Sequence, residues 1–189
     1  MDVKRAGPVG QLWLITGERG AGKTLLCQRQ AAQARLSGLD VAGVLSPGVF
    51  EAGEKIAIQV EDVRSGERRL LASRAAPLEG RCSLNQSPNP TRSSFDLGWS
   101  FDLQALEWGN TVLQQATPCD VLIVDELGPL EFLQGQGWQA GLHAISGGAY
   151  RLALVVVRPS LLSQAQQRWP AAGVIPAGGP GKFDLLAEL

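Results

Sequence analysis

The chain has 189 residues with 17 basic and 18 acidic side chains, one histidine and three cysteines, and a formal net charge of −1. The lone histidine and the widely spaced cysteines exclude a histidine-rich zinc site, a zinc ribbon and a disulfide framework. The near-neutral charge predicts neither a nucleic-acid nor a membrane partner, and no apolar run reaches the roughly 18 residues of a spanning helix. We therefore expect a cytoplasmic protein with one domain over 1–189, whose folded core covers about 11–176.

The N-terminal part of the chain predicts a strand, a glycine-rich loop, a helix and a second strand. An apolar run at 12–15 predicts a buried strand, and a further run at 41–45 predicts the next one. Residues 23–36 contain no Gly or Pro and predict a helix, in which Leu25, Leu26, Ala32 and Leu36 recur at helical spacing.

A hairpin and a long loop are expected next. Residues 55–60 alternate between apolar and polar, a turn follows at 64–67, and residues 70–72 predict the return strand. Residues 73–94 carry several Pro, Ser and Arg without periodicity, which predicts a long loop.

The second half of the chain alternates between helices and apolar strands. We expect a helix at 102–116 with Asp102 as its cap, a strand at 121–124, a helix at 136–145, a strand at 152–157, a helix through 168 capped by Ser160, and a strand at 173–175. Apolar strands in this alternation predict an α/β fold, a three-layer sandwich with a mostly parallel sheet and the hairpin inserted.

The loop after the first strand matches the phosphate-binding pattern G-x-x-x-x-G-K-[ST]. Its glycines let backbone N–H groups turn toward phosphate oxygens at the start of the helix. The lysine would reach the β- and γ-phosphates, and the threonine hydroxyl would bind Mg²⁺. The predicted nucleotide-binding residues are Gly17, Glu18, Arg19, Gly20, Ala21, Gly22, Lys23 and Thr24.

Two acids follow the apolar strand at 121–124. An acid in this position holds Mg²⁺ in P-loop enzymes, so Asp125 and Thr24 are the predicted metal ligands. Glu126 is placed to orient and deprotonate a water molecule, and the predicted catalytic residues are Lys23, Asp125 and Glu126. Glu131 is either part of the metal and water network or a surface acid, and Arg158 is either a cation that stabilises transferred charge or a surface residue.

Residues 17–24, together with the segment Asp125-Glu126-Leu127-Gly128-Pro129-Leu130-Glu131, resemble the small cancer-related nucleoside-triphosphatase family. The second segment is the more specific of the two. The resemblance implies Mg²⁺-dependent hydrolysis of nucleoside triphosphates (ATP, GTP or others) with broad base preference. It also implies a P-loop NTPase fold near the RecA-like and nucleotide-kinase-like proteins.

Two other functions remain open from the residues alone. A kinase would use the same loop but transfer the γ-phosphate to an acceptor, and Arg74, Arg81 and Arg92 in the predicted long loop could bind one. A nucleotide-dependent switch or assembly factor would bind the same ligand with little turnover. The base that is preferred, the oligomeric state and any protein partner cannot be predicted from these residues.

Overall fold

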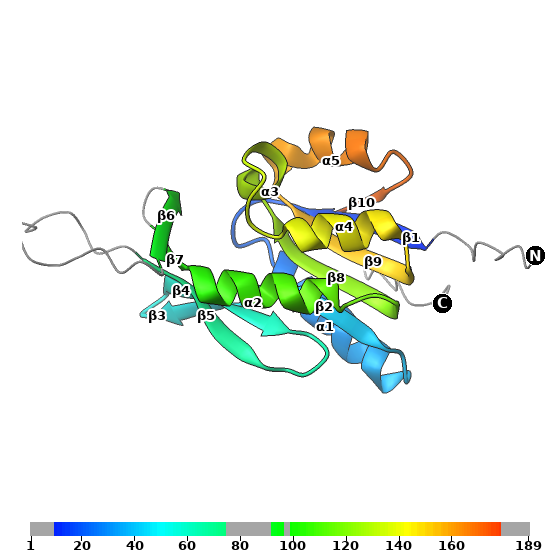
Figure 1. The fold of residues 1–189 in the computed structure, drawn as a ribbon, viewed down its shortest axis with the longest axis horizontal. Coiled ribbons are helices and arrows are strands. Elements are labelled where there is room, and N and C mark those ends of the chain that lie inside the picture. Colours follow the sequence, from blue (N-terminus) through cyan, green and yellow to red (C-terminus); the bar gives the residue numbers. More distant parts are fainter. Residues whose placement is uncertain (1–9, 75–91, 97–98, 179–189) are drawn as a thin grey trace, which may run out of the picture.

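In the computed structural model, which describes residues 10–74, 92–96 and 99–178, ten strands form one mixed sheet. The strand order is β10-β1-β9-β8-β2-β4-β5-β7-β6, and β3 pairs with β4 (Figure 1). The strands are β1 (Gln11–Thr16), β2 (Val41–Leu45), β3 (Gly48–Glu51), β4 (Glu54–Asp62), β5 (Arg68–Arg74), β6 (Arg92–Asp96), β7 (Trp99–Asp102), β8 (Cys119–Leu127), β9 (Tyr150–Val157) and β10 (Gly173–Pro176). The helices are α1 (Lys23–Leu36), α2 (Leu103–Gln114), α3 (Pro129–Leu133), α4 (Gln139–Gly147), the short 3-10 helix η1 (Pro159–Leu161) and α5 (Leu162–Arg168).

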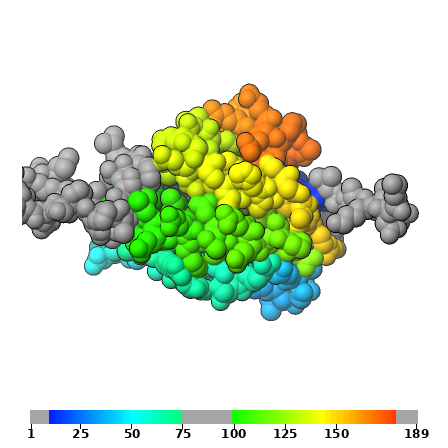
Figure 2. Space-filling model, in the orientation of Figure 1, coloured from blue at the N-terminus to red at the C-terminus, as the bar shows by residue number. Residues whose placement is uncertain are grey.

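The strands β10, β1, β9, β8 and β2 run parallel and form the buried centre of the molecule. Their apolar side chains point to both faces, because each face is covered by helices. The helices α2, α4 and α5 pack on one face and α1 packs on the other. Figure 2 shows α2 in green, α4 in yellow and α5 in orange lying next to one another over the first face. The predicted three-layer α/β sandwich is confirmed.

Beyond β2 the sheet continues as an antiparallel extension made of β3, β4, β5, β7 and β6. The predicted hairpin is confirmed as β4 and β5. The predicted loop at 73–94 is wrong at both ends, because β5 runs through Arg74 and β6 begins at Arg92. β5 pairs with β4 and β7, and β6 pairs with β7, the next strand along the chain; residues 75–91 of the predicted loop lie outside the described part of the chain.

The helix α1 forms where it is predicted, and the side chains that it buries are not the four apolar ones that indicated it. The buried side chains are Cys27, Gln30, Ala31 and Ala34, whereas Leu36 is 91% exposed and Leu25 48% exposed. Positions 27, 30, 31 and 34 follow one helical stripe. Small side chains on that stripe let the helix axis lie close to the sheet, which the larger leucines would prevent.

Other boundaries in the second half differ by a few residues. Asp102 caps α2 as predicted, accepting hydrogen bonds from the backbone N–H of Gln104 at 2.9 Å and of Ala105 at 3.1 Å. The predicted helix at 136–145 begins at Gln139, and the short α3 precedes it. Ser160 lies inside η1 and makes no capping hydrogen bond, so that prediction is wrong. Among the helices of the described residues, none has the length and hydropathy needed to cross a bilayer.

Gly109 of α2 is the contact point between α2 and the start of α4. A Cβ at this position would lie 2.5 Å from Cζ3 of the buried Trp138. Next to it, Asn110 donates to the carbonyl of Gly137 at 2.9 Å and accepts from the N–H of Ala140 at 3.0 Å. A side chain at position 109 would therefore separate two elements that are also held by hydrogen bonds.

We predict that Gly109→Ala destabilises the protein by about 1–2 kcal/mol, because the displacement of Trp138 outweighs the gain in helix propensity. Gly147→Ala is the matched control. Gly147 is the last residue of α4, and a Cβ at this position would meet nothing within 4 Å. This control should leave stability unchanged or raise it by up to about 1 kcal/mol. Chemical denaturation measures both, and equal stabilities would contradict the close packing at Gly109.

Candidate active site

The predicted site residues come together at one edge of the sheet. The parallel strands β1, β8 and β9 all end there, so the loops that follow them are neighbours. In open α/β sheets this edge is where ligands bind. The loop after β1 carries residues 17–24, the end of β8 carries Asp125 and Glu126, and Arg158 follows β9.

The glycine-rich loop lies between β1 and α1 as predicted. Gly20 and Gly22 have φ values of 83° and 85°, which glycine adopts at low cost. The Lys23 ammonium lies across the loop and donates to the carbonyl oxygens of Gly17 at 2.6 Å and Glu18 at 2.9 Å. The loop therefore presents a lysine and the N-terminus of a 14-residue helix on one side of the site.

Asp125 is a buried carboxylate near the end of β8, only 2% exposed. It makes a side-chain hydrogen bond with Thr24 at the start of α1, and its Oδ2 accepts from the backbone N–H of Ser46 at 3.2 Å. Burial raises the pKa of Asp125 to about 6; the charge of Glu126 adds to this, while the hydrogen bonds from Thr24 and Ser46 oppose it. The carboxylate is thus fixed against the glycine-rich loop.

The residues Thr24 and Asp125 fit a magnesium ion. Both supply oxygen atoms, which Mg²⁺ prefers, and Mg²⁺ usually takes only one or two protein ligands besides water and phosphate oxygens. The described residues hold no cluster of three or more His, Cys, Asp or Glu side chains suited to a metal. That donor set suits an ion shared with a phosphate ligand rather than one enclosed by protein side chains.

Glu126 forms an ion pair with Arg158 across the ends of β8 and β9. The Arg158 Nε donates to the Glu126 Oε1 at 2.7 Å, and the two side chains are 48% and 33% exposed. Arg158 is thus an exposed residue in direct contact with a predicted catalytic residue, and its role in stabilising transferred charge stays a prediction.

Glu131 is neither a surface acid nor free to bind a ligand. It is 7% exposed, and its two oxygens accept from the backbone N–H groups of Gly128 and Trp138, both at 2.7 Å. Burial raises the pKa of Glu131, and these two hydrogen bonds partly offset the increase. Glu131 therefore fixes the start of α3 and the approach to α4.

Three residues at this edge are absent from the predicted site. Ser46 holds the Asp125 carboxylate, Lys55 of β4 is half-buried, and the Trp99 ring of β7 lies 6.0 Å from the Lys55 Nζ. Ser46 follows a strand that pairs in parallel with β8, so knowledge of the strand order would have placed it there. Lys55 and Trp99 lie in neither of the two predicted site segments, and their position at this edge depends on the strand order.

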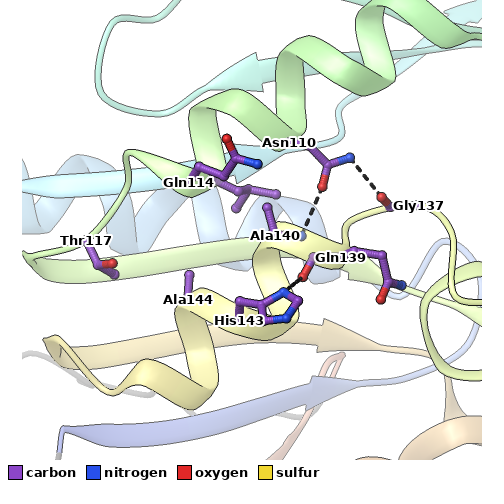
Figure 3. Close-up of a pocket in the computed structure, with 9 residues that line it drawn as sticks. Asn110, Gln114, Thr117, Gly137, Gln139, Ala140, His143 and Ala144 are labelled. Atoms are coloured by element: carbon purple, nitrogen blue, oxygen red, sulfur yellow. Dashed lines mark hydrogen bonds between the residues drawn. The ribbon is translucent and has the colours of Figure 1, made fainter.

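A pocket lies elsewhere in the described part of the chain, on the helical face between α2 and α4. It has a volume of about 600 Å³ and contains none of the predicted site residues. Figure 3 shows that two of its polar side chains, Asn110 and His143, make hydrogen bonds within the protein. Asn110 bonds to Gly137 and Ala140, and the His143 Nδ1 lies 2.8 Å from the Gln139 carbonyl. We assign no chemistry to this pocket.

The chain is similar in sequence to known proteins. A family model described as NTPase matches residues 13–168. "Nucleoside-triphosphatase THEP1" of Ignicoccus hospitalis is 32% identical over 133 residues, which cover 70% of this chain and 68% of that protein. The matching segment spans 58% of the length of proteins with the same name from Caldivirga maquilingensis and Methanopyrus kandleri.

Two solved structures have the same fold. The solution structure of a human cancer-related nucleoside triphosphatase matches with a TM-score of 0.62 and 23% identity, covering 88% of both chains. The crystal structure of THEP1 from Aquifex aeolicus matches with a TM-score of 0.64 and 17% identity, covering 94% of this chain and 96% of that one. At these identities the likeness concerns the fold alone.

We predict that Glu131→Gln lowers the free energy of unfolding by about 1–3 kcal/mol. Each carboxylate oxygen now accepts a hydrogen bond from a backbone N–H, and in the variant the amide NH₂, itself a donor, would face one of these N–H groups. Glu107→Gln, at an exposed position of α2, is the control and should be neutral. Urea denaturation of both variants tests this. A Glu131→Gln variant as stable as the control would show that the two hydrogen bonds contribute nothing.

We also predict that the buried Asp125 makes the metal-free protein less stable as the pH rises. Its pKa is about 6 in the folded protein against 3.8 ordinarily, so stability present below pH 4 is lost as the pH rises through 6. The loss is about 3 kcal/mol, from about two pKa units at 1.36 kcal/mol each. Asp125→Asn removes the titration, so its stability relative to the unaltered protein should grow between pH 4 and 7 in the presence of a chelator. A pH-independent difference would contradict this.

Proposed function

The chain belongs to the NTPase family, and from that membership we propose that it hydrolyses nucleoside 5′-triphosphates to diphosphates and phosphate in a Mg²⁺-dependent reaction. The family membership confirms the resemblance drawn from residues 17–24 and 125–131. The relatives are named nucleoside-triphosphatases, and a triphosphate substrate follows for this chain from their similarity.

The hydrogen bond between Thr24 and Asp125 is the observation that carries this proposal. It joins the glycine-rich loop to the end of β8, so that the two predicted metal ligands are in contact. Glu126, the next residue, lies at the same edge and is one-third exposed. A phosphate cradle, a pair of oxygen ligands and an accessible carboxylate are the parts that phosphoanhydride hydrolysis requires.

In the proposed mechanism, backbone N–H groups of residues 18–24 bind the phosphates and Lys23 balances the charge of the β- and γ-phosphates. Thr24 and Asp125 would hold Mg²⁺, which when bound neutralises phosphate charge. Glu126 accepts a proton from a water molecule whose oxygen attacks the γ-phosphorus. The bond between the γ-phosphorus and the bridging oxygen breaks, and the diphosphate leaves.

We further propose that base preference is broad. The groups predicted to bind the phosphates and the metal are backbone amides, Lys23, Thr24 and Asp125, none of which contacts a base. The sequence has no N-K-x-D-like segment to read guanine. A site that binds a nucleotide through its phosphates alone would bind nucleotides with different bases equally well.

The kinase alternative draws no support from the described residues. Its candidate acceptor ligand Arg74 is ion-paired with Glu54 at 2.5 Å, while Arg81 and the Arg92 side chain lie outside the described residues. The test is phosphate release from ATP, GTP, CTP and UTP with Mg²⁺ and no acceptor. Release from all four supports the proposal; turnover that appears only with an added acceptor would establish a kinase, and binding without turnover would favour a switch.

We predict that Glu126→Gln lowers kcat by roughly 10²- to 10⁴-fold through loss of the general base, with nucleotide affinity little changed. Glutamine can still accept the hydrogen bond from Arg158, so the local geometry should persist. Glu107→Gln again serves as the control. Steady-state phosphate release and nucleotide titration give the two quantities, and undiminished turnover would remove Glu126 from this role.

A further inference from the structure

The hairpin formed by β3 and β4 extends past the edge of the sheet beside the candidate site. Only the last residues of β4, Glu61 and Asp62, pair with β2. Lys55, near the start of β4, precedes Glu61 by six residues. Because β4 is antiparallel to β2, its first residues lie beyond the end of β2, at the edge where β8 also ends. The register shifts between Val49 and Phe50 in the β3–β4 pair and between Ile58 and Gln59 in the β4–β5 pair, and such irregularities bend strands. Figure 1 shows β3, β4 and β7 together at one end of the molecule.

The path of the Lys55 side chain along this hairpin depends on a glycine. A Cβ at Gly48 would lie 2.7 Å from the Lys55 Cε, so any other residue at position 48 would push the lysine aside. The Lys55 Nζ then lies 6.0 Å from the centre of the Trp99 ring, at the limit of a cation–π contact.

The Lys55 ammonium lies within the electrostatic field of the candidate site. Burial lowers the pKa of Lys55; the carboxylates of Glu126 and Asp125 oppose this, while the charges of Arg19 and Arg158 add to it. Glu126 exerts the larger attraction of the two acids. The Lys55 ammonium is therefore near enough to Glu126 and Asp125 to be influenced by their charges.

Lys55 nevertheless has no ion-pair partner among the described residues. No described carboxylate lies within 4.0 Å of its Nζ, whereas Arg74 and Arg158 at the same edge are both paired. A half-buried ammonium without a carboxylate partner is costly. An anionic ligand would supply the missing partner.

We propose that Lys55 is a second phosphate-binding lysine, whose ammonium contacts the terminal phosphate of a bound nucleoside triphosphate. The inference rests on the proposed triphosphate substrate and adds a residue to the site. Lys23 belongs to the loop that cradles the whole phosphate chain, whereas Lys55 comes from the side of Glu126, where the terminal phosphate would be attacked. Lys55 thus distinguishes a triphosphate from a diphosphate.

The test compares the affinities for a non-hydrolysable β,γ-imido triphosphate and for the diphosphate, both with Mg²⁺. Lys55→Met should weaken triphosphate binding roughly 10- to 100-fold, as expected for loss of a charge-assisted hydrogen bond, and should change diphosphate binding much less. Lys55→Arg should restore most of the preference. Arg69→Met is the matched control. This cation lies in β5, 4.3 Å from the Trp108 ring, at the end of the β4–β5 pair opposite to Lys55, and its loss should affect the binding of neither ligand.

Equal weakening of triphosphate and diphosphate binding would overturn the proposal, since Lys55 would then only balance the charges of Asp125 and Glu126. Unchanged binding would overturn it as well. Amine acetylation of the unaltered protein, read by mass spectrometry, provides an assay that needs no variant to fold. The imido triphosphate should protect Lys55 and the diphosphate should not, while both protect Lys23; equal labelling of Lys55 with the two ligands contradicts the inference.

Neither measurement depends on turnover. Absence of phosphate release with an intact Lys55 effect would refute hydrolysis and leave this inference standing. Normal phosphate release without a Lys55 effect would refute the inference alone.

Discussion

A negative charge buried at the end of an apolar strand is the constraint on which this structure depends. Asp125 is 2% exposed, and its hydrogen bonds come from two other segments, Thr24 after the glycine-rich loop and Ser46 after β2. Burial of one carboxylate therefore ties three neighbouring segments of the sheet edge together. Because hydrogen bonds offset only part of the cost of burying a charge, the same arrangement favours the binding of a cation there.

The two parts of the sheet contribute different chemistry to this edge. The parallel strands end in loops that present backbone N–H groups, a helix N-terminus and carboxylates. The antiparallel extension adds a lysine and an aromatic ring, Lys55 and Trp99, because β4 begins beyond the point where β2 ends. The parallel strands reach the candidate site only through the loops that follow them. The antiparallel strands of the extension, in contrast, bring side chains of the strands themselves to its side.

Features set by contiguous residues could be predicted from the sequence, and features set by strand order could not. The glycine-rich loop, the span of α1 and the Asp102 cap depend on nearby residues, and all three are confirmed. The roles of Ser46 and Lys55 depend on which strands are neighbours. The buried stripe of α1, which includes Ala31, likewise depends on how the helix contacts the sheet and differs from the apolar residues that indicated the helix.

The position of Glu131 changes how the segment at 125–131 should be interpreted across distant relatives. Its carboxylate closes a loop onto Gly128 and Trp138 and so fixes the direction in which the chain leaves β8. The last acid of the segment is thus an architectural element, while the first two lie at the candidate site. A relative that has lost this acid would carry a rerouted loop rather than an inactive site, so its absence alone is a poor criterion for assigning loss of activity.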